Sequence, residues 1–171
     1  MENMEKILEG ARIVPRLEKH EAVISRWQYA GEYAFYDPPE PFRPSLPDQP
    51  VDANSFVWVN AGGEVLGHVS YGPDGRIPTA EGYPYPDSHL DIGLGLRPGL
   101  CGRGLGAGFV RLCLRFAEER YGADRFRLSV AAFNARAVKV YERVGFSIEC
   151  EVTNSVFHNK FYIMTGVRAG A

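Results

Sequence analysis

The spacing of hydrophobic residues along the chain predicts an ordered series of strands and helices. Apolar side chains at every second position indicate half-buried strands, whereas apolar side chains three or four positions apart indicate a helix with one buried face. The expected strands cover residues 12–16, 56–59, 65–71, 90–96, 126–130, 147–153 and 160–167. The expected helices cover residues 18–29, a stretch that begins in the glycine-rich segment 102–108, and the residues between Asn134 and Gly145. The order β-α-β-β-β-α-β-α-β-β predicts a single mixed α/β domain over residues 1–171.

Two polar segments interrupt this pattern. Residues 37–50 contain six of the twelve prolines in the chain, so they are expected to form a stiff, extended loop without regular structure. Residues 72–88 form a second loop, which carries Tyr83 and Tyr85. Because long loops inside a compact domain more often border a site than link two domains, both segments are candidates for the wall of a functional cleft.

Composition and charge narrow the class of protein. Hydrophobic residues make up 45% and charged residues 23% of the chain, as in an ordinary globular domain. A formal net charge of −2 gives no electrostatic reason to expect a nucleic acid or an anionic membrane as partner. The three cysteines are odd in number and widely spaced, which argues against a disulfide framework and a zinc site and fits a reducing cytoplasm.

No targeting or membrane segment is visible in the sequence. The first residues lack the basic region and apolar core of a secretory signal, and no apolar run approaches the roughly 20 residues that span a bilayer. The four histidines lie far apart along the chain. We therefore expect a cytoplasmic protein without a bound metal.

The strongest chemical signal is a glycine-rich turn between a strand and a helix. The strand over residues 90–96 ends at Arg97-Pro98, and Gly102-Arg103-Gly104-Leu105-Gly106-Ala107-Gly108 then opens the helix. Glycine permits positive φ and has no Cβ atom to obstruct a ligand. Backbone N–H groups in such a turn, together with the positive end of the helix dipole, favour a phosphate or pyrophosphate. The alternative is a tight connection that binds nothing.

Two other nucleotide-binding folds fit less well. Gly102, Gly104 and Ala107 satisfy the dinucleotide fingerprint Gly-x-Gly-x-x-Gly/Ala, which also expects an acidic residue at the end of the next strand. That strand ends in residues 129–134, which contain no acid. A Walker-type phosphate loop requires Lys-Ser/Thr after the glycines, and this pair is missing too. These differences disfavour a dinucleotide-dependent oxidoreductase and a nucleotide triphosphatase.

The linked motifs resemble those of the GNAT superfamily of acyl-CoA-dependent N-acetyltransferases. The family's pyrophosphate pattern, Gln/Arg-x-x-Gly-x-Gly/Ala, falls on residues 101–106, with Cys101 in place of the usual Gln or Arg. Residues 91–98 resemble the strand that enters this loop in the branch that acetylates ribosomal-protein N-termini. Asn134, Tyr141 and Gly145-Phe146 match the family's Asn…Tyr…Gly-Phe helix in spacing. The resemblance implies the acetyltransferase fold, a mostly antiparallel central sheet with flanking helices.

The resemblance also implies acetyl-CoA as co-substrate and a set of residues that bind it. Backbone N–H groups of Leu94, Gly95 and Leu96 would polarise the thioester carbonyl, and Gly93 and Gly95 would let the ligand approach the strand; a strand bulge is the alternative for these glycines. The pyrophosphate would be held by Gly102, Arg103, Gly104, Leu105, Gly106 and Ala107. The Arg103 side chain is either a charge-assisted donor to a phosphate or a solvated surface residue. Asn134 would hydrogen-bond the cofactor, cap the following helix, or do both.

The same comparison suggests two catalytic residues. Tyr141 is the candidate general acid for the departing thiolate, because the pKa of a phenol, near 10, is comparable to that of a thiol. Tyr141 also belongs to an apolar helical stripe with Val140 and Val144, so it could simply be a core residue. Asp91 is the candidate general base, since related enzymes often carry Glu at this position. The alternatives are a solvated or salt-bridged Asp91, or His89 on the same face of the strand.

The resulting hypothesis is a cytoplasmic N-acetyltransferase that moves an acetyl group from acetyl-CoA to a primary amine by direct attack in a ternary complex. The amine could belong to a protein N-terminus or to a small molecule. The runner-up is a non-catalytic acyl-CoA-binding sensor domain, although Asn134 and Tyr141 argue against a loss of activity. Neither a nucleic acid nor a membrane is expected as partner, and the sequence leaves a homodimer open.

Overall fold

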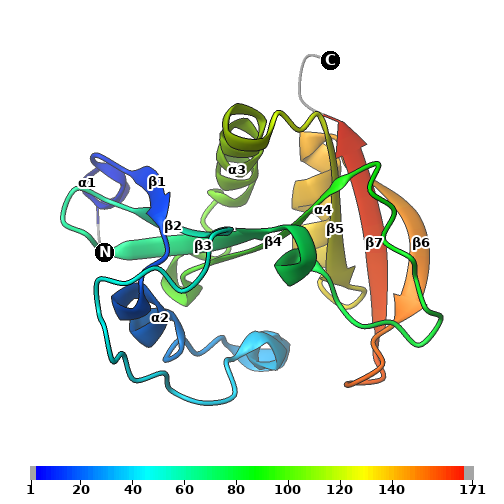
Figure 1. Cartoon of the computed structure of the whole chain (residues 1–171), viewed down its shortest axis with the longest axis horizontal. Helices are drawn as coiled ribbons and strands as arrows, with labels where there is room; N and C mark the ends of the chain where they lie inside the picture. The colour runs from blue at the N-terminus through cyan, green and yellow to red at the C-terminus, as the bar shows by residue number, and fades with distance from the viewer. Residues whose placement is uncertain (1–2, 168–171) are drawn as a thin grey trace. The chain divides into compact units, whose positions relative to one another are not determined.

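The computed structural model describes residues 3–167. Its helices are α1 Met4–Leu8, α2 Glu18–Ile24, α3 Gly106–Tyr121 and α4 Ala135–Val144 (Figure 1). Its strands are β1 Arg12–Pro15, β2 Ser55–Val59, β3 Val65–Tyr71, β4 Leu90–Leu96, β5 Arg125–Ala131, β6 Ser147–Thr153 and β7 Lys160–Val167. Short 3-10 helices lie at Gly31–Tyr36, Gly72–Gly75 and Pro98–Leu100.

The strands form one seven-stranded sheet in the hydrogen-bonded order β1-β2-β3-β4-β5-β7-β6. The pairs β1–β2, β5–β7 and β6–β7 are antiparallel, whereas β4 and β5 are parallel. A parallel pair needs a crossover connection, and α3 supplies it between β4 and β5. The predicted mixed α/β fold, with a mostly antiparallel sheet and flanking helices, is confirmed.

Two helices differ from the sequence-based expectation. Helix α1 was not predicted, because its five residues are too few to show a helical period; Asn3 caps it by accepting a hydrogen bond from the N–H of Glu5. Helix α2 ends at Ile24 rather than at residue 29. The hydroxyl of Ser25 donates to the carbonyl of Ala22 at this end of the helix. The aromatic residues that follow keep the apolar spacing of the helix, but they are not part of it.

The described chain contains two compact units. The first comprises residues 3–69 and 94–101, and the second comprises residues 70–93 and 102–167. Strands β3 and β4 each contribute residues to both units. The single domain expected from the sequence stays a prediction.

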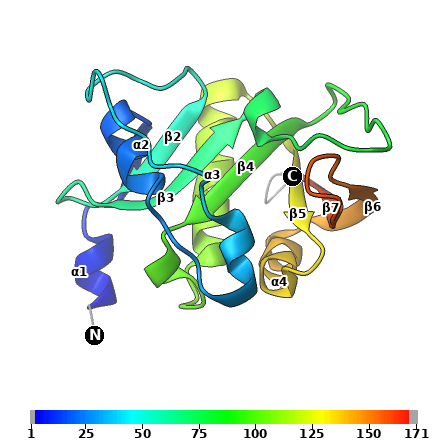
Figure 2. The same ribbon diagram turned by 90° about the horizontal axis from the view of Figure 1, so that it is seen from below.

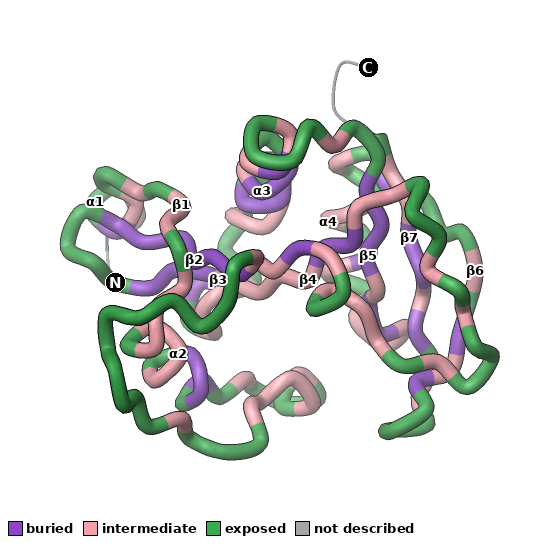
Figure 3. The backbone as a smooth tube through the Cα atoms, viewed as in Figure 1, coloured by how far each residue is buried: buried purple, intermediate pink, exposed green. Residues whose placement is uncertain are grey.

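The first unit has its core on strand β2, which is buried along its whole length (Figure 3). Residues from α2, from the turn after it and from the strands β2 and β3 form one apolar cluster, with half-buried Val14 and Tyr29 packed against it. Its buried members are Ile24, Trp27, Val57, Val59 and Val65. This cluster explains why the turn after α2 is ordered, since Trp27 is buried only three residues beyond the end of the helix.

The second unit is built around α3 and the strands β5 and β7. The buried residues of α3 recur three or four positions apart, as the sequence predicted: Phe109, Val110, Cys113, Leu114 and Ala117. The hydroxyl of buried Tyr71 donates to the carbonyl of Cys113 over 2.7 Å and so ties α3 to the end of β3. Helix α4 lies against the part of the sheet formed by β5 and β7 (Figures 1 and 2).

The loop between β3 and β4, residues 72–89, is bound to β6 and the residues after it at several points. Thr79 forms a β-bridge with Asn154, and the N–H of Ala80 donates to the carbonyl of Thr153 over 2.8 Å. The hydroxyl of Tyr83 donates to a carboxylate oxygen of Glu149 on β6 over 3.0 Å. Residues 79–83 of this loop are therefore held against β6 and the residues that follow it; that the loop borders a site stays a prediction.

Strand β6 ends the sheet and is irregular. Its register to β7 shifts between Ile148 and Cys150, so Glu149 forms a bulge. Ile148, Glu149 and Glu151 are all exposed on this strand. Bulges and charged side chains are features that protect the edge of a sheet from pairing with another strand.

Candidate active site

Strands β4 and β5 are paired over only part of their length. Their parallel ladder joins Leu90 to Phe126, Asp91 to Arg127 and Ile92 to Leu128, and among residues 3–167 it ends there. Strand β4 continues to Leu96, while β5 continues to Ala131 with β7 as its antiparallel partner. Residues 94–96, which are predicted to bind the thioester, therefore follow directly after the end of the ladder.

Two glycines of β4 face other parts of the protein. A Cβ atom built on Gly95 would lie 2.7 Å from Nε2 of His68, and one built on Gly93 would lie 3.2 Å from Cα of Gly75. Both distances are shorter than ordinary carbon contacts, so these positions need glycine because protein atoms approach them closely. Close approach of protein atoms thus gives a structural reason for both glycines, and the expectation that they open the strand to a ligand stays a prediction. The proposed role of the backbone N–H groups of residues 94–96 stays a prediction.

His68 is a residue that sequence reasoning did not select. It lies half-buried on β3 beside Gly95, with its ring centroid 5.9 Å from that of Trp27. Desolvation by burial, assisted by the positive charge of Arg16, lowers the pKa of His68 to about 3. His68 therefore places a neutral imidazole next to residues 94–96 at neutral pH. No local pattern identifies this residue, because its environment depends on β4 and on Trp27, which lie far from it in the sequence.

The lowered pKa of His68 predicts a loss of stability in acid. In the unfolded chain the pKa of this histidine is near 6.5, so its imidazole binds a proton below that pH. In the folded protein His68 stays neutral down to about pH 3. The contribution of neutral His68 is thus fully present above about pH 6.5 and declines as the pH falls toward 3, by at most about 1.4 kcal/mol per pH unit. Urea unfolding between pH 7.5 and 4.5 should show a shallower decline for His68→Gln than for the wild type.

The exposed His158 offers a matched control for this experiment. Its φ of +64° is a conformation that asparagine tolerates, so His158→Asn removes an imidazole with little strain. The unfolding free energy of His158→Asn should decline with pH as that of the wild type does. An equally steep decline in His68→Gln would show that His68 does not cause the acid sensitivity.

The glycine-rich segment forms an exposed turn before α3. Gly102 and Gly104 have φ values of +71° and +80°, and a Cβ atom at Gly104 would meet no described atom within 4 Å. Helix α3 begins at Gly106, and its N-cap residue, Leu105, makes no side-chain capping hydrogen bond. The first intrahelical bond is donated by Phe109, so the preceding N–H groups of the helix remain for a ligand or solvent. This turn has the features of an anion site at a helix N-terminus.

Two arginines lie on the turn or beside it. Arg103 is exposed within it. Nη1 of Arg136, in the first turn of α4, would lie 3.4 Å from a Cβ atom on Gly102. Sequence reasoning missed Arg136, although its position two residues after Asn134 is a usable signal. Ala107, in the first turn of α3, is half-buried.

Asn134 and Tyr141 lie at the two ends of α4. Oδ1 of Asn134 accepts a hydrogen bond of 3.1 Å from the N–H of Ala137, which confirms the capping role among the alternatives for this residue. Tyr141 is half-buried, and its ring packs edge-on against buried Phe146 at a centroid distance of 6.1 Å. Tyr141 is therefore positioned by packing without being sealed in the core. Its role as acid, and contact of Asn134 with the cofactor, stay predictions.

Asp91 has a different environment from that of a free base. Its side chain is 2% exposed, and it accepts from Nε of Arg127 over 2.6 Å, Nη2 of Arg127 over 2.8 Å and Nε of Arg76 over 2.8 Å. A buried carboxylate held by two guanidinium groups has no direct access to an amine from the solvent. This environment does not support the predicted base and matches the salt-bridged alternative instead. The hydroxyl of Ser88 lies 2.8 Å from Nδ1 of His89, the other base candidate.

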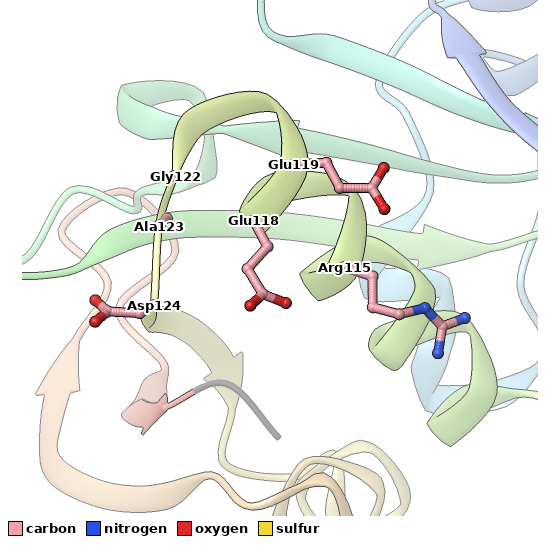
Figure 4. Close-up of a pocket in the computed structure, with 6 residues that line it drawn as sticks. All are labelled: Arg115, Glu118, Glu119, Gly122, Ala123 and Asp124. Carbon is pink, nitrogen blue, oxygen red and sulfur yellow. The ribbon is translucent and has the colours of Figure 1, made fainter. Parts of the chain in front are cut away.

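A shallow hollow lies at the opposite end of α3 from the glycine turn (Figure 4). Its lining residues are Arg115, Glu118, Glu119, Gly122, Ala123 and Asp124. A helix of 16 residues is roughly 24 Å long, which is too far for this hollow to belong to the turn. Three carboxylates against one arginine also make it a poor place for phosphate groups.

No three His, Cys, Asp or Glu side chains come together within residues 3–167 in a way that could hold a metal ion. None of the helices in this part of the chain combines the length and the apolar character needed to cross a membrane.

Comparisons with known proteins agree with the fold. A streptothricin acetyltransferase from Streptomyces lavendulae is 33% identical over 108 residues, which are 62% of this chain and 50% of that protein. Among solved structures, AAC(6')-Ib in complex with ribostamycin and coenzyme A gives a TM-score of 0.66 at 21% identity and covers 94% of both chains. A ribosomal-protein-S5-alanine acetyltransferase from Vibrio fischeri gives 0.63 at 15% identity, covering 95% of this chain and 96% of that one.

These likenesses differ in what they establish. The chain spans about half the length of the streptothricin acetyltransferase, and the structural neighbours share too little sequence to show more than the fold. Residues 20–146, by contrast, match the acetyltransferase (GNAT) family as a whole and include the turn, β4 and α4. With the fold, the glycine turn and the capped helix α4 in agreement, the chain belongs to the acetyltransferase (GNAT) family.

Proposed function

We propose that this protein is an N-acetyltransferase that transfers an acetyl group from acetyl-CoA to a primary amine. The observation that carries the proposal is the exposed glycine turn at the uncapped N-terminus of α3, within a chain of the acetyltransferase family. AAC(6')-Ib, whose fold the chain shares, is bound to coenzyme A in its solved structure. Nothing in the described residues favours the alternative of a non-catalytic sensor domain.

In this proposal the turn holds the pyrophosphate of acetyl-CoA through residues 102–107. The backbone N–H groups supply the directional hydrogen bonds, since a φ near +80° at Gly104 and the missing side chain expose them. Arg103 and Arg136 supply positive charge on the turn and beside it. Arg136 is an addition to the residues expected from the sequence. Asn134, which caps α4, would also contact the cofactor in this proposal.

The acetyl group would lie along residues 94–96, where backbone N–H groups stabilise the oxyanion as the amine attacks the carbonyl carbon. Leu96 is fixed at this position because its carbonyl accepts a hydrogen bond of 2.8 Å from the hydroxyl of Tyr29. The C–S bond then breaks and Tyr141 donates its proton to the leaving thiolate. Asp91 is not the general base in this scheme. A water molecule, in the site or in the solvent shell of the amine, takes the proton that the attacking amine loses.

The acceptor would be a cationic amine. The acetyltransferases that resemble this chain include one named for streptothricin and one solved with the aminoglycoside ribostamycin. In the first unit, Glu32 and Glu40 are exposed on either side of Asp37, whose carboxylate accepts from the N–H of Tyr29 over 2.7 Å. Exposed carboxylates next to half-buried aromatic rings attract amines that are protonated at neutral pH.

The segment 31–40 therefore predicts a charge effect on acceptor binding. Changing Glu32 and Glu40 together to Gln should raise the acceptor KM about 3- to 30-fold, since each exposed charge interaction contributes up to about 1 kcal/mol. The KM for acetyl-CoA should stay the same. Steady-state kinetics with each substrate varied in turn measures both values. Glu119→Gln, which removes an exposed charge from α3, is the matched control, and an unchanged acceptor KM in the double variant would place the acceptor elsewhere.

The activity itself is tested by release of free CoA thiol from acetyl-CoA in the presence of candidate amines. The panel should include streptothricin, an aminoglycoside, spermidine and a peptide with a free N-terminal alanine. Mass spectrometry of the product should show the acetyl group on the amine. Tight CoA binding without turnover on any amine would favour the sensor domain, and absence of CoA binding would refute the proposal.

A further inference from the structure

We propose that Asp91 and Arg127 are a positioning pair, which fixes the end of the β4–β5 ladder and thereby the strand on which the acetyl group is held. This inference rests on the proposed function and assigns Asp91 a role other than base. Asp91 and Arg127 are direct neighbours in the ladder, one pair before its last pair. Their side chains are 2% and 1% exposed.

The geometry of the pair is well suited to setting the register of the two strands. Arg127 donates from Nε and Nη2 to the two oxygens of Asp91, over 2.6 and 2.8 Å, in the two-pronged arrangement available to arginine. A shift of β5 by one residue would place buried Phe126 or Leu128 opposite Asp91 and leave its charge unpaired. Since an unpaired buried charge is costly, the pair excludes the neighbouring registers.

The pair also holds the loop over residues 72–89. Nη1 and Nη2 of Arg127 donate to the carbonyl of Pro86, both over 3.1 Å, and its guanidinium lies 5.6 and 5.2 Å from the ring centroids of Tyr83 and Tyr85. Arg76 reaches Asp91 from the same loop and lies 5.2 Å from the Tyr85 ring. Asp91 and Arg127 thus join β4, β5 and this loop at one buried point.

Asp91 lies close in sequence to residues 94–96, which are proposed to bind the acetyl group. Asp91 precedes Leu94 by only three residues, and β4 is extended throughout. Residues 94–96 continue the same strand, so in this proposal the pair sets where their backbone begins. Misplacement of reacting groups by about 1 Å can cost roughly 100-fold in rate. We therefore expect the pair to affect catalysis without touching the substrate.

The experiment is a double-mutant cycle on kcat/KM for acetyl-CoA, using Asp91→Asn, Arg127→Gln and the double variant. Each single variant should lower kcat/KM by about 10- to 100-fold at a temperature where it is folded. The loss in the double variant should be well below the product of the two single losses, because the second change removes an interaction already broken. The pH profile of Asp91→Asn should keep the acid limb of the wild type.

Two variants keep the test decisive. Arg127→Lys retains the buried cation and is expected to fold even if Arg127→Gln does not, yet it cannot bind both oxygens of Asp91 and should still lose activity. Arg125→Gln removes an exposed arginine two residues away on the same face of β5 and should behave as the wild type. Circular dichroism and the midpoint of thermal unfolding establish which variants are folded.

Two results would overturn the inference. A normal kcat/KM in folded Arg127→Gln and Arg127→Lys, with only a lower unfolding temperature, would reduce the pair to a stabilising contact. A severe loss confined to the Asp91 variants, with the acid limb of the pH profile removed, would return Asp91 to the role of base. Failure of the proposed function is distinguishable from both, because the wild type would then transfer no acetyl group.

Discussion

Replacing Tyr141 with phenylalanine is expected to lower kcat by about 10²- to 10⁴-fold, the range for the loss of one general acid. The phenol is the group that would protonate the leaving thiolate of CoA, whereas the ring itself packs against Phe146. Phenylalanine keeps that packing, so the variant should fold and bind CoA nearly as the wild type does. Single-turnover kinetics and calorimetric titration with CoA measure the two properties separately.

Tyr162→Phe provides the matched control for this prediction. Tyr162 is a half-buried tyrosine on β7, so the control removes a phenolic hydroxyl from a comparable environment in the same unit. Its kcat should be close to that of the wild type. If Tyr141→Phe retained full activity as well, Tyr141 would be a packing residue, and another group would have to protonate the thiolate.

Changing Gly104 to glutamate is expected to abolish measurable binding of CoA. Gly104 has a φ of +80°, and its missing side chain leaves open space above the backbone of the turn. Glutamate would add a negative charge where the pyrophosphate is proposed to bind and would strain the backbone that presents the N–H groups. Calorimetry should show a loss of at least about 100-fold in affinity, since a single charge repulsion at close range costs several kcal/mol.

The same substitution at Gly122 separates charge at the site from backbone strain. Gly122 ends α3 with a φ of +65°, and a Cβ atom there also meets no described atom within 4 Å. Gly122→Glu therefore imposes a comparable strain at the far end of the same helix. CoA should bind to it with wild-type affinity. Equal loss of affinity in both variants would mean that strain in α3, rather than occupancy of the turn, causes the effect.

Most of the fold was predictable because its elements carry strong local signals. The strands over residues 90–96, 147–153 and 160–167 were predicted with the bounds that the structure has, and each shows the alternation expected of a strand or follows a clear turn. The helix between Asn134 and Gly145 has a capping residue at its start and a glycine at its end. Helix α1 was missed because its five residues are too few to show a helical period. The end of α2 was placed too late because the irregular segment after it continues the same apolar pattern.

The site was predictable only where its features are local. The glycine turn is visible in the sequence because its residues are contiguous. The partners of Asp91 are 15 and 36 residues away, at Arg76 and Arg127, and no spacing rule connects them. The contact of His68 with Gly95 likewise depends on how β3 and β4 meet. Long-range packing therefore determines the burial of Asp91 and the lowered pKa of His68.

The irregular edge strand β6 has a consequence for assembly. A second copy that continued the sheet would need an unbroken row of backbone donors and acceptors, but the bulge at Glu149 interrupts that row. Glu149 and Glu151 would also face the glutamates of an identical antiparallel strand, so like charges would meet. Any self-association should therefore use side-chain surfaces instead of main-chain hydrogen bonding across β6, and the protein should tolerate high concentration without forming fibres along this edge.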